Sequence, residues 1–370
     1  MSSKLFQPLQ IGQCTLKNRV VMAPLTRFRA NDTHAPLPMV AEYYAQRASV
    51  PGTLLISEAT FIAPQAGGYD NAPGIYSQEQ IAAWKKVTDA VHAKGSFIYL
   101  QLWALGRAAD PSALAKDGFK VKSSSDVAFE GGAKPEPLTE AEIQEYIGLY
   151  AQAAKNSIAA GFDGVEIHGA NGYLIDQFTQ DTANKRTDAW GGSIEKRARF
   201  GLEVAKAVVE AVGADKTGIR LSPFSSFQGM KMADPVPQFT YFVNELKKLN
   251  LAYLHLVESR INGNADTEAT EKVDPLIEAW GKTSPVLLAG GFKPDSAKRA
   301  VDEEYKDKDI AIVFGRLFIS NPDIVFRVQH GIELTPYDRN LFYNKGEAHG
   351  YTTWPFSKEF EAAQEVMTAA

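Results

Sequence analysis

Residues 164–173 read Gly164-Val165-Glu166-Ile167-His168-Gly169-Ala170-Asn171-Gly172-Tyr173, which predicts a strand that runs into a loop. Strand side chains alternate between two faces, so Val165 and Ile167 point one way while Glu166 and His168 point the other. A strand in a helix-covered parallel sheet is normally apolar on both faces. Two polar side chains on one face therefore indicate a cavity. A buried, hydrogen-bonded pair that holds the loop is the alternative interpretation.

The loop after this strand continues the polar pattern. His168 and Asn171 supply two hydrogen-bond donors, and Tyr173 adds a phenol close behind them. Donors grouped in this way suit chemistry at an oxygen atom. The stretch therefore predicts a catalytic or binding site at a strand end.

The composition is that of an ordinary globular protein with a large core. Of the 370 residues, 45% are hydrophobic and 22% are charged, and the formal net charge is -5. This mildly acidic balance argues against nucleic acid or an anionic membrane as the main partner. The single cysteine, Cys14, excludes an internal disulfide framework, and no cysteine and histidine cluster has the spacing of a zinc site. We therefore expect no metal.

The chain ends carry no targeting pattern. The N-terminal residues Met1–Pro8 lack an apolar signal core, and no apolar run reaches the roughly 18 residues that span a bilayer. The C-terminal residues Thr368–Ala370 are not a peroxisomal address. These observations predict a cytoplasmic protein without a membrane partner.

Short apolar runs alternate with longer amphipathic runs along the chain. The alternation predicts an α/β protein, a single closed (β/α)8 TIM barrel over residues 1–370, in preference to an open doubly wound sheet. In such a barrel the active site lies at the C-terminal ends of the strands. The eight expected strands are Val20–Ala23, Leu54–Ala59, Phe97–Trp103, Gly164–Gly169, Gly218–Ser222, Tyr253–Val257, Val286–Ala289 and Ala311–Phe314.

A helix is expected after each strand. Two helix starts carry a capping box, in which Ser77 precedes Gln80 and Thr139 precedes Glu142 by three residues. The expected helices are Met39–Ala48, Gln80–Ala93, Glu140–Ala159, Ile194–Val212, Pro237–Leu249, Val273–Trp280, Pro294–Val301 and Pro322–Gln329.

Two segments depart from the alternation. Residues 5–16 predict a hairpin across the floor of the barrel, with Gly12 at its turn. Residues 104–137 form an excursion after the third strand that is longer than a simple connection. We expect this excursion to be a capping insertion with a short hairpin of its own, and a mobile surface insertion is the alternative.

Several strands carry polar side chains on the face that should point into the barrel. Alternation turns Gln101 inward on the third strand and Arg220 inward on the fifth. A buried arginine is costly without a partner, so a structural salt bridge, for example with Glu166, is the alternative to a role in binding. His255, inside the sixth strand, is expected to be a hydrogen-bonded core histidine.

The loops after the last two strands predict a phosphate site. Gly290 and Gly291 follow the seventh strand, and Gly315 and Arg316 follow the eighth. Glycine allows backbone amides to approach an anion, and arginine offers a planar fork to phosphate oxygens. These are the loops in which TIM barrels commonly bind phosphate. No Gly-rich Rossmann or P-loop pattern follows a strand, which argues against a dinucleotide fold or an NTPase.

At this point the residues match a known pattern. From Leu5 to Tyr351 the chain resembles the Old Yellow Enzyme family of FMN-dependent NADPH dehydrogenases, or ene-reductases. The resemblance lies in the segments Asn18-Arg19-Val20-Val21-Met22-Ala23-Pro24-Leu25-Thr26-Arg27, Gln101-Leu102-Trp103, His168-Gly169-Ala170-Asn171-Gly172-Tyr173-Leu174, Arg186-Thr187-Asp188-Ala189-Trp190-Gly191-Gly192-Ser193, Gly218-Ile219-Arg220-Leu221-Ser222-Pro223 and Phe314-Gly315-Arg316.

The resemblance implies a tightly but non-covalently bound FMN across the barrel mouth. Thr26 would be the hydroxyl that tunes the flavin, and Gly291 stands where some relatives carry a polar side chain, so its phosphate contact would use the backbone alone. The implied contacts are Pro24, Leu25, Thr26 and Ala59 to the ring, Gln101 and Arg220 to the pyrimidine edge and ribityl chain, and Gly290, Gly291, Gly315 and Arg316 to the phosphate.

The resemblance also implies a ping-pong reaction. NADPH or NADH would reduce the flavin and leave, and an α,β-unsaturated carbonyl or nitro compound would then be reduced in the same pocket. His168 and Asn171 would bind the substrate oxygen, and Tyr173 would protonate the α-carbon. Trp103 and Tyr343 would also contact the substrate, in an apolar pocket completed by Leu25, Tyr69, Phe224 and Phe292.

Such a pocket suits a cyclic enone or a terpenoid, and the enzyme would be a monomer or a homodimer. Three alternatives remain open from the sequence. The first is a dedicated reductase or isomerase of one natural-product pathway. The second is a catalytically silent flavin-binding barrel. The third is a barrel that binds a sugar phosphate without flavin.

Overall fold

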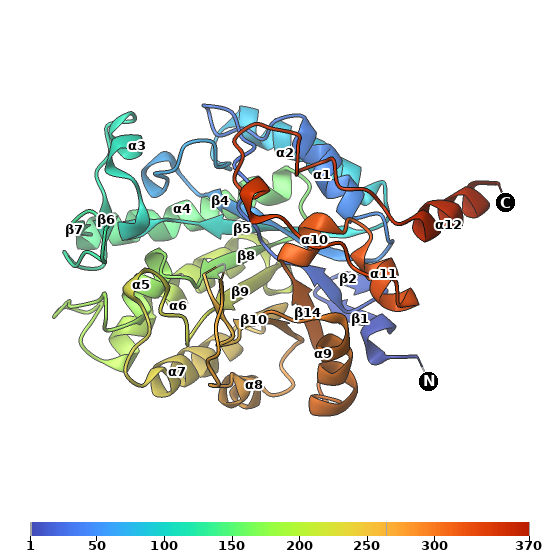
Figure 1. Cartoon of the computed structure of the whole chain (residues 1–370). Helices are drawn as coiled ribbons and strands as arrows, with labels where there is room; N and C mark the ends of the chain where they lie inside the picture. The colour runs from blue at the N-terminus through green and yellow to red at the C-terminus, as the bar shows by residue number, and fades with distance from the viewer. Residues whose placement is uncertain (1, 264, 370) are drawn as a thin grey trace.

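In a computed structural model that describes residues 2–263 and 265–369, eight parallel strands close into a barrel surrounded by helices (Figure 1). The predicted TIM barrel is confirmed, because the last strand of the barrel pairs in parallel with the first, Ile312 opposite Val20 and Phe314 opposite Met22. The barrel strands are β3 (Val20–Met22), β4 (Leu54–Phe61), β5 (Phe97–Trp103), β8 (Gly164–Gly169), β9 (Thr217–Leu221), β10 (Tyr253–Val257), β13 (Val286–Ala289) and β14 (Ile310–Phe314).

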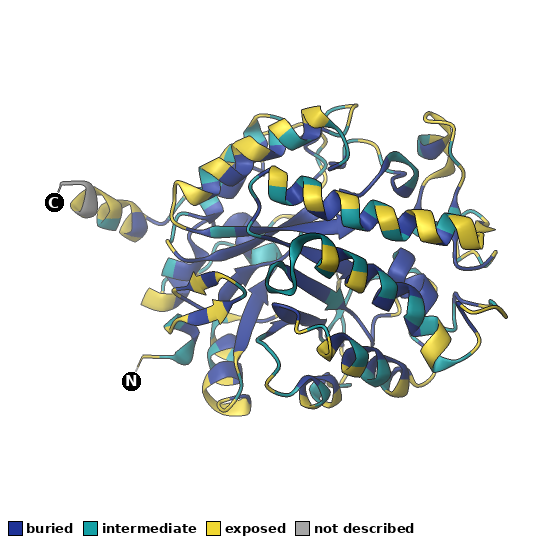
Figure 2. Cartoon of the chain, turned by 180° about the vertical axis from the view of Figure 1, so that it is seen from behind, coloured by how far each residue is buried: buried dark blue, intermediate teal, exposed yellow. Residues whose placement is uncertain are grey.

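The helices that follow these strands cover the outside of the barrel. Figure 2 shows exposed residues along the outer face of these helices, while the strands behind them are buried. Each predicted helix has a counterpart, and both predicted capping boxes are formed. The covering helices are α1 (Met39–Arg47), α2 (Gln78–His92), α4 (Glu140–Ala159), α6 (Ile194–Val212), α7 (Pro235–Lys247), α8 (Asp274–Trp280), α9 (Pro294–Arg299) and α11 (Ile324–His330).

Other short elements were not predicted, and most connect or flank the barrel units. One of them, α12, extends away from the barrel at the C-terminal end of the chain (Figure 1). Within the described residues, no helix combines the length and the apolar character that crossing a bilayer requires. These elements are α5 (Leu174–Thr179), α10 (Arg316–Ser320), α12 (Lys358–Ala369), the π-helical turn Ala300–Glu304, and the 3₁₀ turns Lys4–Phe6, Pro64–Ala66, Gly106–Ala108, Ala214–Lys216, Phe227–Gly229 and Arg339–Leu341.

The N-terminal hairpin closes the floor of the barrel, as predicted. Its strands β1 (Leu9–Ile11) and β2 (Cys14–Leu16) are antiparallel, and their apolar side chains pack against Tyr99 and Tyr253 of the barrel interior. Gly12 lies at the turn with a φ of +52°, and a Cβ there would stand 1.9 Å from the carbonyl oxygen of Asp215. Only glycine satisfies both the conformation and the close approach.

The insertion at residues 104–137 leaves the C-terminal end of β5 and contains α3 (Pro111–Ala115), β6 (Lys122–Ser123) and β7 (Glu136–Pro137). The expected hairpin is wrong, because β6 and β7 pair in parallel. The chain between them turns back before it enters β7, so both strands run the same way. The guanidinium of Arg107 donates to the carbonyl oxygen of Val127 within the insertion (3.0 Å) and to that of Gln228 (2.9 Å), which fastens the insertion to the loop after β9.

The capping box of α4 gives a direct test of local stability. The hydroxyl of Thr139 accepts a hydrogen bond from the backbone N–H of Glu142 at 3.2 Å. Replacing Thr139 with Ala leaves that N–H without its cap, and we expect a loss of about 1 kcal/mol in the free energy of unfolding. Urea denaturation would measure it, with Thr139→Ser as the control that keeps the acceptor. Equal stabilities of Thr139→Ala and the wild type would show that the box contributes nothing.

Candidate active site

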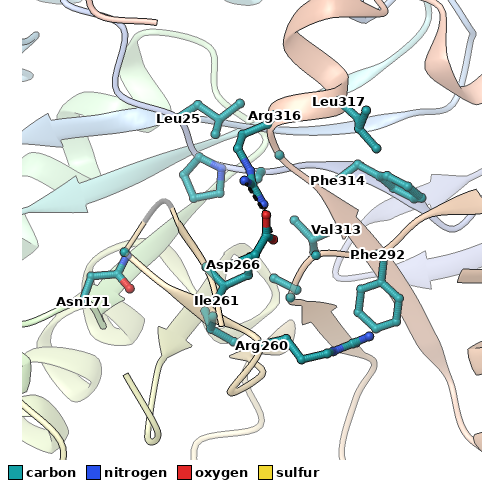
Figure 3. Close-up of a pocket in the computed structure, with 18 of the residues that line it drawn as sticks. Leu25, Asn171, Arg260, Ile261, Asp266, Phe292, Val313, Phe314, Arg316 and Leu317 are labelled. Atoms are coloured by element: carbon teal, nitrogen blue, oxygen red, sulfur yellow. Dashed lines mark hydrogen bonds and ion pairs between the residues drawn. The ribbon is translucent and has the colours of Figure 1, made fainter. Parts of the chain in front are cut away.

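A cavity of about 610 Å³ opens at the C-terminal ends of the barrel strands. Its volume lies within the range of small-molecule and cofactor sites. The walls come from the ends of β3, β9, β10, β13 and β14, from the loops that follow them and from the loop after β8 (Figure 3). This is the face on which TIM barrels carry out their chemistry.

Most of the residues expected to bind FMN meet in this cavity. They approach from strand ends that are far apart in the sequence, so the closed barrel alone brings them together. Those that line it are Pro24, Leu25, Thr26, Arg220, Gly290, Gly291, Gly315 and Arg316.

Ala59 and Gln101 do not line the cavity, although both were expected to touch the flavin. They are neighbours on β4 and β5, paired directly after an irregularity in the strand register. Both are buried, and the side-chain amide of Gln101 donates to Glu166 at 2.8 Å. They lie behind the cavity wall, where Gln101 is held by a carboxylate.

The glycines after β13 form a cradle that suits a phosphate. Gly290 and Gly291 have φ angles of +144° and +66°, and a Cβ on Gly290 would lie 2.7 Å from the Cβ of Glu258. Side chains are therefore excluded at Gly290, and the backbone is open to a close approach. Arg316 faces the same space with a guanidinium fork. The donor set and the size of the cavity fit FMN.

Asp266 lies in this cradle, a contact that the sequence did not reveal. It belongs to a small hairpin of β11 (Ile261–Asn262) and β12 (Ala265–Asp266) after β10. Its carboxylate accepts two hydrogen bonds from Arg316, at 2.7 and 3.1 Å (Figure 3). The hydrogen bond from Arg316 lowers the pKa of Asp266, so the group is an anion. A cofactor phosphate would compete with it for the guanidinium.

The three predicted catalytic residues lie together at the end of β8. Asn171 and Tyr173 line the cavity, and His168 lies behind them with 4% of its surface exposed. The rings of His168 and Tyr173 are 5.0 Å apart between centroids. The loop thus presents an amide and a phenol to the cavity, with an imidazole beside them.

The imidazole of His168 is neutral and its tautomer is defined. Burial and the nearby positive charge of Arg220 lower its pKa well below the ordinary value. Its Nδ1 accepts a hydrogen bond from the backbone N–H of Ala170 at 3.3 Å, so the proton resides on Nε2. His168 therefore has a single ring N–H to donate, at Nε2, the nitrogen that makes no hydrogen bond to the backbone.

Asn171 is held by its backbone from two sides. Its N–H donates to the hydroxyl of Ser222 (2.7 Å), and its carbonyl oxygen accepts from the side-chain amide of Gln228 (3.0 Å). The next residue, Gly172, must be glycine, because a Cβ there would lie 3.0 Å from the Cβ of Gln228. Gln228 was missed by sequence reasoning, since a glutamine in an irregular loop carries no pattern.

Tyr173 is a protonated phenol. Burial raises its pKa above the ordinary value, and the neighbouring Tyr69 and Tyr343 add to the shift. The ring of Trp103 stands edge-on to it at 5.1 Å between centroids. The phenol therefore keeps its proton at neutral pH while its ring is fixed by packing.

The apolar pocket forms only in part as expected. Leu25, Phe292 and Tyr343 line the cavity, and Tyr343 is 46% exposed. Trp103 does not line it, being 1% exposed and stacked on Phe61 at 5.1 Å. The other two expected residues also lie outside the cavity lining: Tyr69 packs edge-on against Trp103, and Phe224 lies in the hydrophobic core.

Arg220 has a partner other than the expected one. Its Nε donates to Nε2 of His255 at 3.4 Å, while Nδ1 of His255 bonds to Glu166 at 2.8 Å. His255 is fully buried and hydrogen-bonded, so it fits the core histidine expected from its strand position. Within the described residues, Arg220 and Glu166 form no direct salt bridge; the histidine stands between them.

The fold and the site define a flavin-dependent oxidoreductase built on a (β/α)8 barrel. Residues 4–335 match the model of the NADH:flavin oxidoreductase / NADH oxidase family. The chain belongs to this family, the Old Yellow Enzyme family. It is an FMN-dependent enzyme that uses a nicotinamide cofactor as electron donor, which overturns the alternative of a sugar-phosphate barrel without flavin.

Named relatives agree with this assignment over nearly the whole chain. The chain is 62% identical to the chanoclavine-I aldehyde reductase fgaOx3 of Penicillium roqueforti, over 98% of this chain and 99% of that protein. The structure of Old Yellow Enzyme from Pichia sp. AKU4542 is 42% identical, with a TM-score of 0.89 and coverage of 96% and 94%. Morphinone reductase in complex with tetrahydroNAD is 39% identical, with a TM-score of 0.86 and coverage of 96% and 98%.

The contact between Asp266 and Arg316 predicts the effect of one substitution on cofactor binding. Asp266→Asn removes the anion that competes with the phosphate, and we expect the Kd of the flavin-stripped protein for FMN to fall. Because the side chain of Asp266 is 63% exposed, the gain should not exceed about fivefold. Quenching of FMN fluorescence measures it.

Glu268→Gln makes the same change of charge at an exposed position of the same loop and serves as the control. If Asp266→Asn binds FMN no more tightly than this control, the carboxylate and the phosphate do not compete.

Proposed function

We propose that the enzyme reduces the activated C=C bond of α,β-unsaturated carbonyl or nitro compounds in a ping-pong sequence, with NAD(P)H as the first substrate. The observation that carries the proposal is the loop after β8. It presents the amide of Asn171 and the protonated phenol of Tyr173 to the cavity, with the neutral imidazole of His168 beside them. FMN, when bound, accepts hydride from the nicotinamide cofactor and delivers it to the alkene.

In this proposal His168 and Asn171 bind the oxygen of the substrate. Charge moves onto that oxygen as the β-carbon gains hydride, and prearranged donors stabilise the charge. Loss of one such donor typically costs about 10²–10³-fold in rate. Because Nδ1 of His168 accepts a hydrogen bond from Ala170, Nε2 carries the proton. This tautomer supports the role of His168 as a donor. The hydrogen bonds to the N–H and carbonyl oxygen of Asn171 fix its backbone at the cavity.

Tyr173 then supplies the proton to the α-carbon. A general acid must hold its proton until the transition state, and burial keeps the phenol protonated by raising its pKa. The half-buried side chain borders the cavity, so the proton can reach a bound substrate. Apolar side chains around the phenol limit access of water to it.

For the substrate we propose a large α,β-unsaturated aldehyde or ketone. Tyr343, Phe292 and Leu25 offer apolar area at the cavity, which suits a polycyclic molecule. The relative that is 62% identical is named an aldehyde reductase, and this favours the dedicated natural-product enzyme as a second candidate. A substrate panel separates the two: a dedicated enzyme should leave 2-cyclohexenone unreduced while it reduces one complex aldehyde.

Three further features remain proposals. We propose that the chain works as one domain, with residues 104–137 as a cap packed beside the cavity. The cytoplasm stays the proposed location. A monomer or a homodimer stays the proposed state of assembly.

The role of Tyr173 predicts a split between the two half-reactions. Tyr173→Phe removes the proton donor and keeps the ring, so alkene reduction should slow by about 10²–10⁴-fold. Reduction of the bound flavin by NADPH needs no such proton and should change by less than about threefold. Stopped-flow absorbance at the flavin band follows both steps. Equal losses in the two half-reactions would refute the role, and absence of flavin reduction in the wild type would sink the whole proposal.

The role of His168 predicts a change in ligand affinity. A phenolate imitates the enolate oxygen, and His168→Ala removes one donor to it. We expect the Kd for a para-substituted phenol to rise by roughly ten- to a hundredfold, as read from the change in flavin absorbance. Thr179→Ala, a buried change on α5, serves as the control for general destabilisation. An unchanged phenol Kd in His168→Ala would exclude His168 from the oxygen site.

A further inference from the structure

Glu166 is a fully buried carboxylate at the centre of the barrel, and the proposed reaction gives it no task. It accepts three hydrogen bonds: from the amide of Gln101 (2.8 Å), the hydroxyl of Tyr253 (2.9 Å) and Nδ1 of His255 (2.8 Å). Glu166 lies on β8, and its donors come from β5, which pairs with β8, and from β10, which pairs with β9. Burial of a carboxylate without such partners would be costly.

The contacts define the protonation of this cluster. Burial alone would raise the pKa of Glu166, but His255, Arg220 and Tyr253 outweigh it and lower the pKa, so the group is an anion. Burial and the positive charge of Arg220 lower the pKa of His255, while Glu166 acts in the opposite direction. The net shift is downward, so His255 is neutral. With its Nδ1 proton donated to Glu166, His255 accepts at Nε2 from Arg220.

Glu166 is thereby connected to both side chains expected at the pyrimidine edge and ribityl chain of FMN. It binds Gln101 directly and reaches Arg220 through one imidazole. Arg220 borders the cavity, whereas Glu166 lies below it. The carboxylate therefore holds Gln101 behind the cavity wall, orients Arg220 through His255 and also opposes the positive charge of Arg220.

We propose that Glu166 is a positioning residue that holds Arg220 toward the flavin through His255 and lowers the flavin's reduction potential by offsetting the charge of Arg220. The inference rests on the proposed placement of Arg220 against the cofactor. Reduction adds negative charge to a flavin, so an uncompensated cation nearby favours the reduced form and an added anion disfavours it. A purely structural carboxylate would affect folding and leave the potential unchanged.

The proposed effect of the Glu166 charge on the flavin potential is tested by substituting Glu166→Gln in the FMN-loaded protein. Loss of the anion should raise the preference for reduced over oxidised flavin by about tenfold, equal to about 30 mV for a two-electron couple. A spectrophotometric redox titration against a reference dye measures it. Glu166→Asp keeps the charge and should restore a potential near that of the wild type.

Tyr253→Phe is the matched control for packing. It removes one neutral donor from the same carboxylate without changing the charge, so its shift in potential should be less than about a third of that of Glu166→Gln. A wild-type potential in Glu166→Gln would overturn the proposed charge effect. So would a shift in Tyr253→Phe as large as in Glu166→Gln.

Positioning is tested separately with His255→Leu, which removes both hydrogen bonds between Glu166 and Arg220 but keeps the charges of both. We expect FMN to bind about tenfold more weakly, as followed by its fluorescence. This variant also serves if Glu166→Gln does not fold. An unchanged Kd for FMN would overturn the positioning role.

Failure of this inference differs from failure of the proposed function. If NADPH reduces the flavin normally, while Glu166→Gln leaves the potential unchanged and the His255 variant leaves the Kd for FMN unchanged, only the role of Glu166 is lost. If the wild type binds FMN but NADPH does not reduce it, the proposed reaction is lost instead.

Discussion

The pairing of β14 with β3 is the interaction on which the rest of the structure depends. It joins the two ends of a long chain of strand–helix units into a ring, and the barrel sheet therefore has no edge strand. Closure places Leu25 beside Gly315, where a Cβ would lie 3.5 Å from the Leu25 side chain. The segments proposed to bind the flavin ring and the phosphate, from opposite ends of the sequence, thus share one cavity.

Inside the ring, the need to satisfy buried polar groups shapes the floor of the site. Glu166, His255 and Arg220 form a chain from the centre of the barrel to the cavity wall. Each member is costly to bury alone, and together they compensate one another. Because His255 donates to Glu166 from one ring nitrogen and accepts from Arg220 at the other, Arg220 is held at the cavity wall before a ligand binds, which favours tight binding.

Much of the fold follows from local patterns. The strands and helices were predicted to within a few residues, because hydrophobic periodicity and capping residues such as Ser77 and Thr139 act over short distances. The loops with Gly290, Gly291, Gly315 and Arg316 were also predicted to face the site, and they line the cavity. Their position after the last two strands of the barrel is where the fold commonly binds phosphate. The predicted hairpin in the insertion was wrong, because strand direction there depends on how twelve intervening residues turn. Gln101 and Trp103 were correctly seen as inward but lie behind the cavity wall.

The sequence by itself determined which faces of the strands are polar, which loops can approach an anion and which residues can donate a proton. These properties belong to single residues and to their spacing. Only the tertiary structure decided the partners: Asp266 on Arg316, Gln228 on Asn171, and His255 on Glu166, separated by 50, 57 and 89 positions. Hydrogen bonds and ion pairs act over a few ångströms, so they are set by the approach of distant segments, and no local pattern encodes that approach.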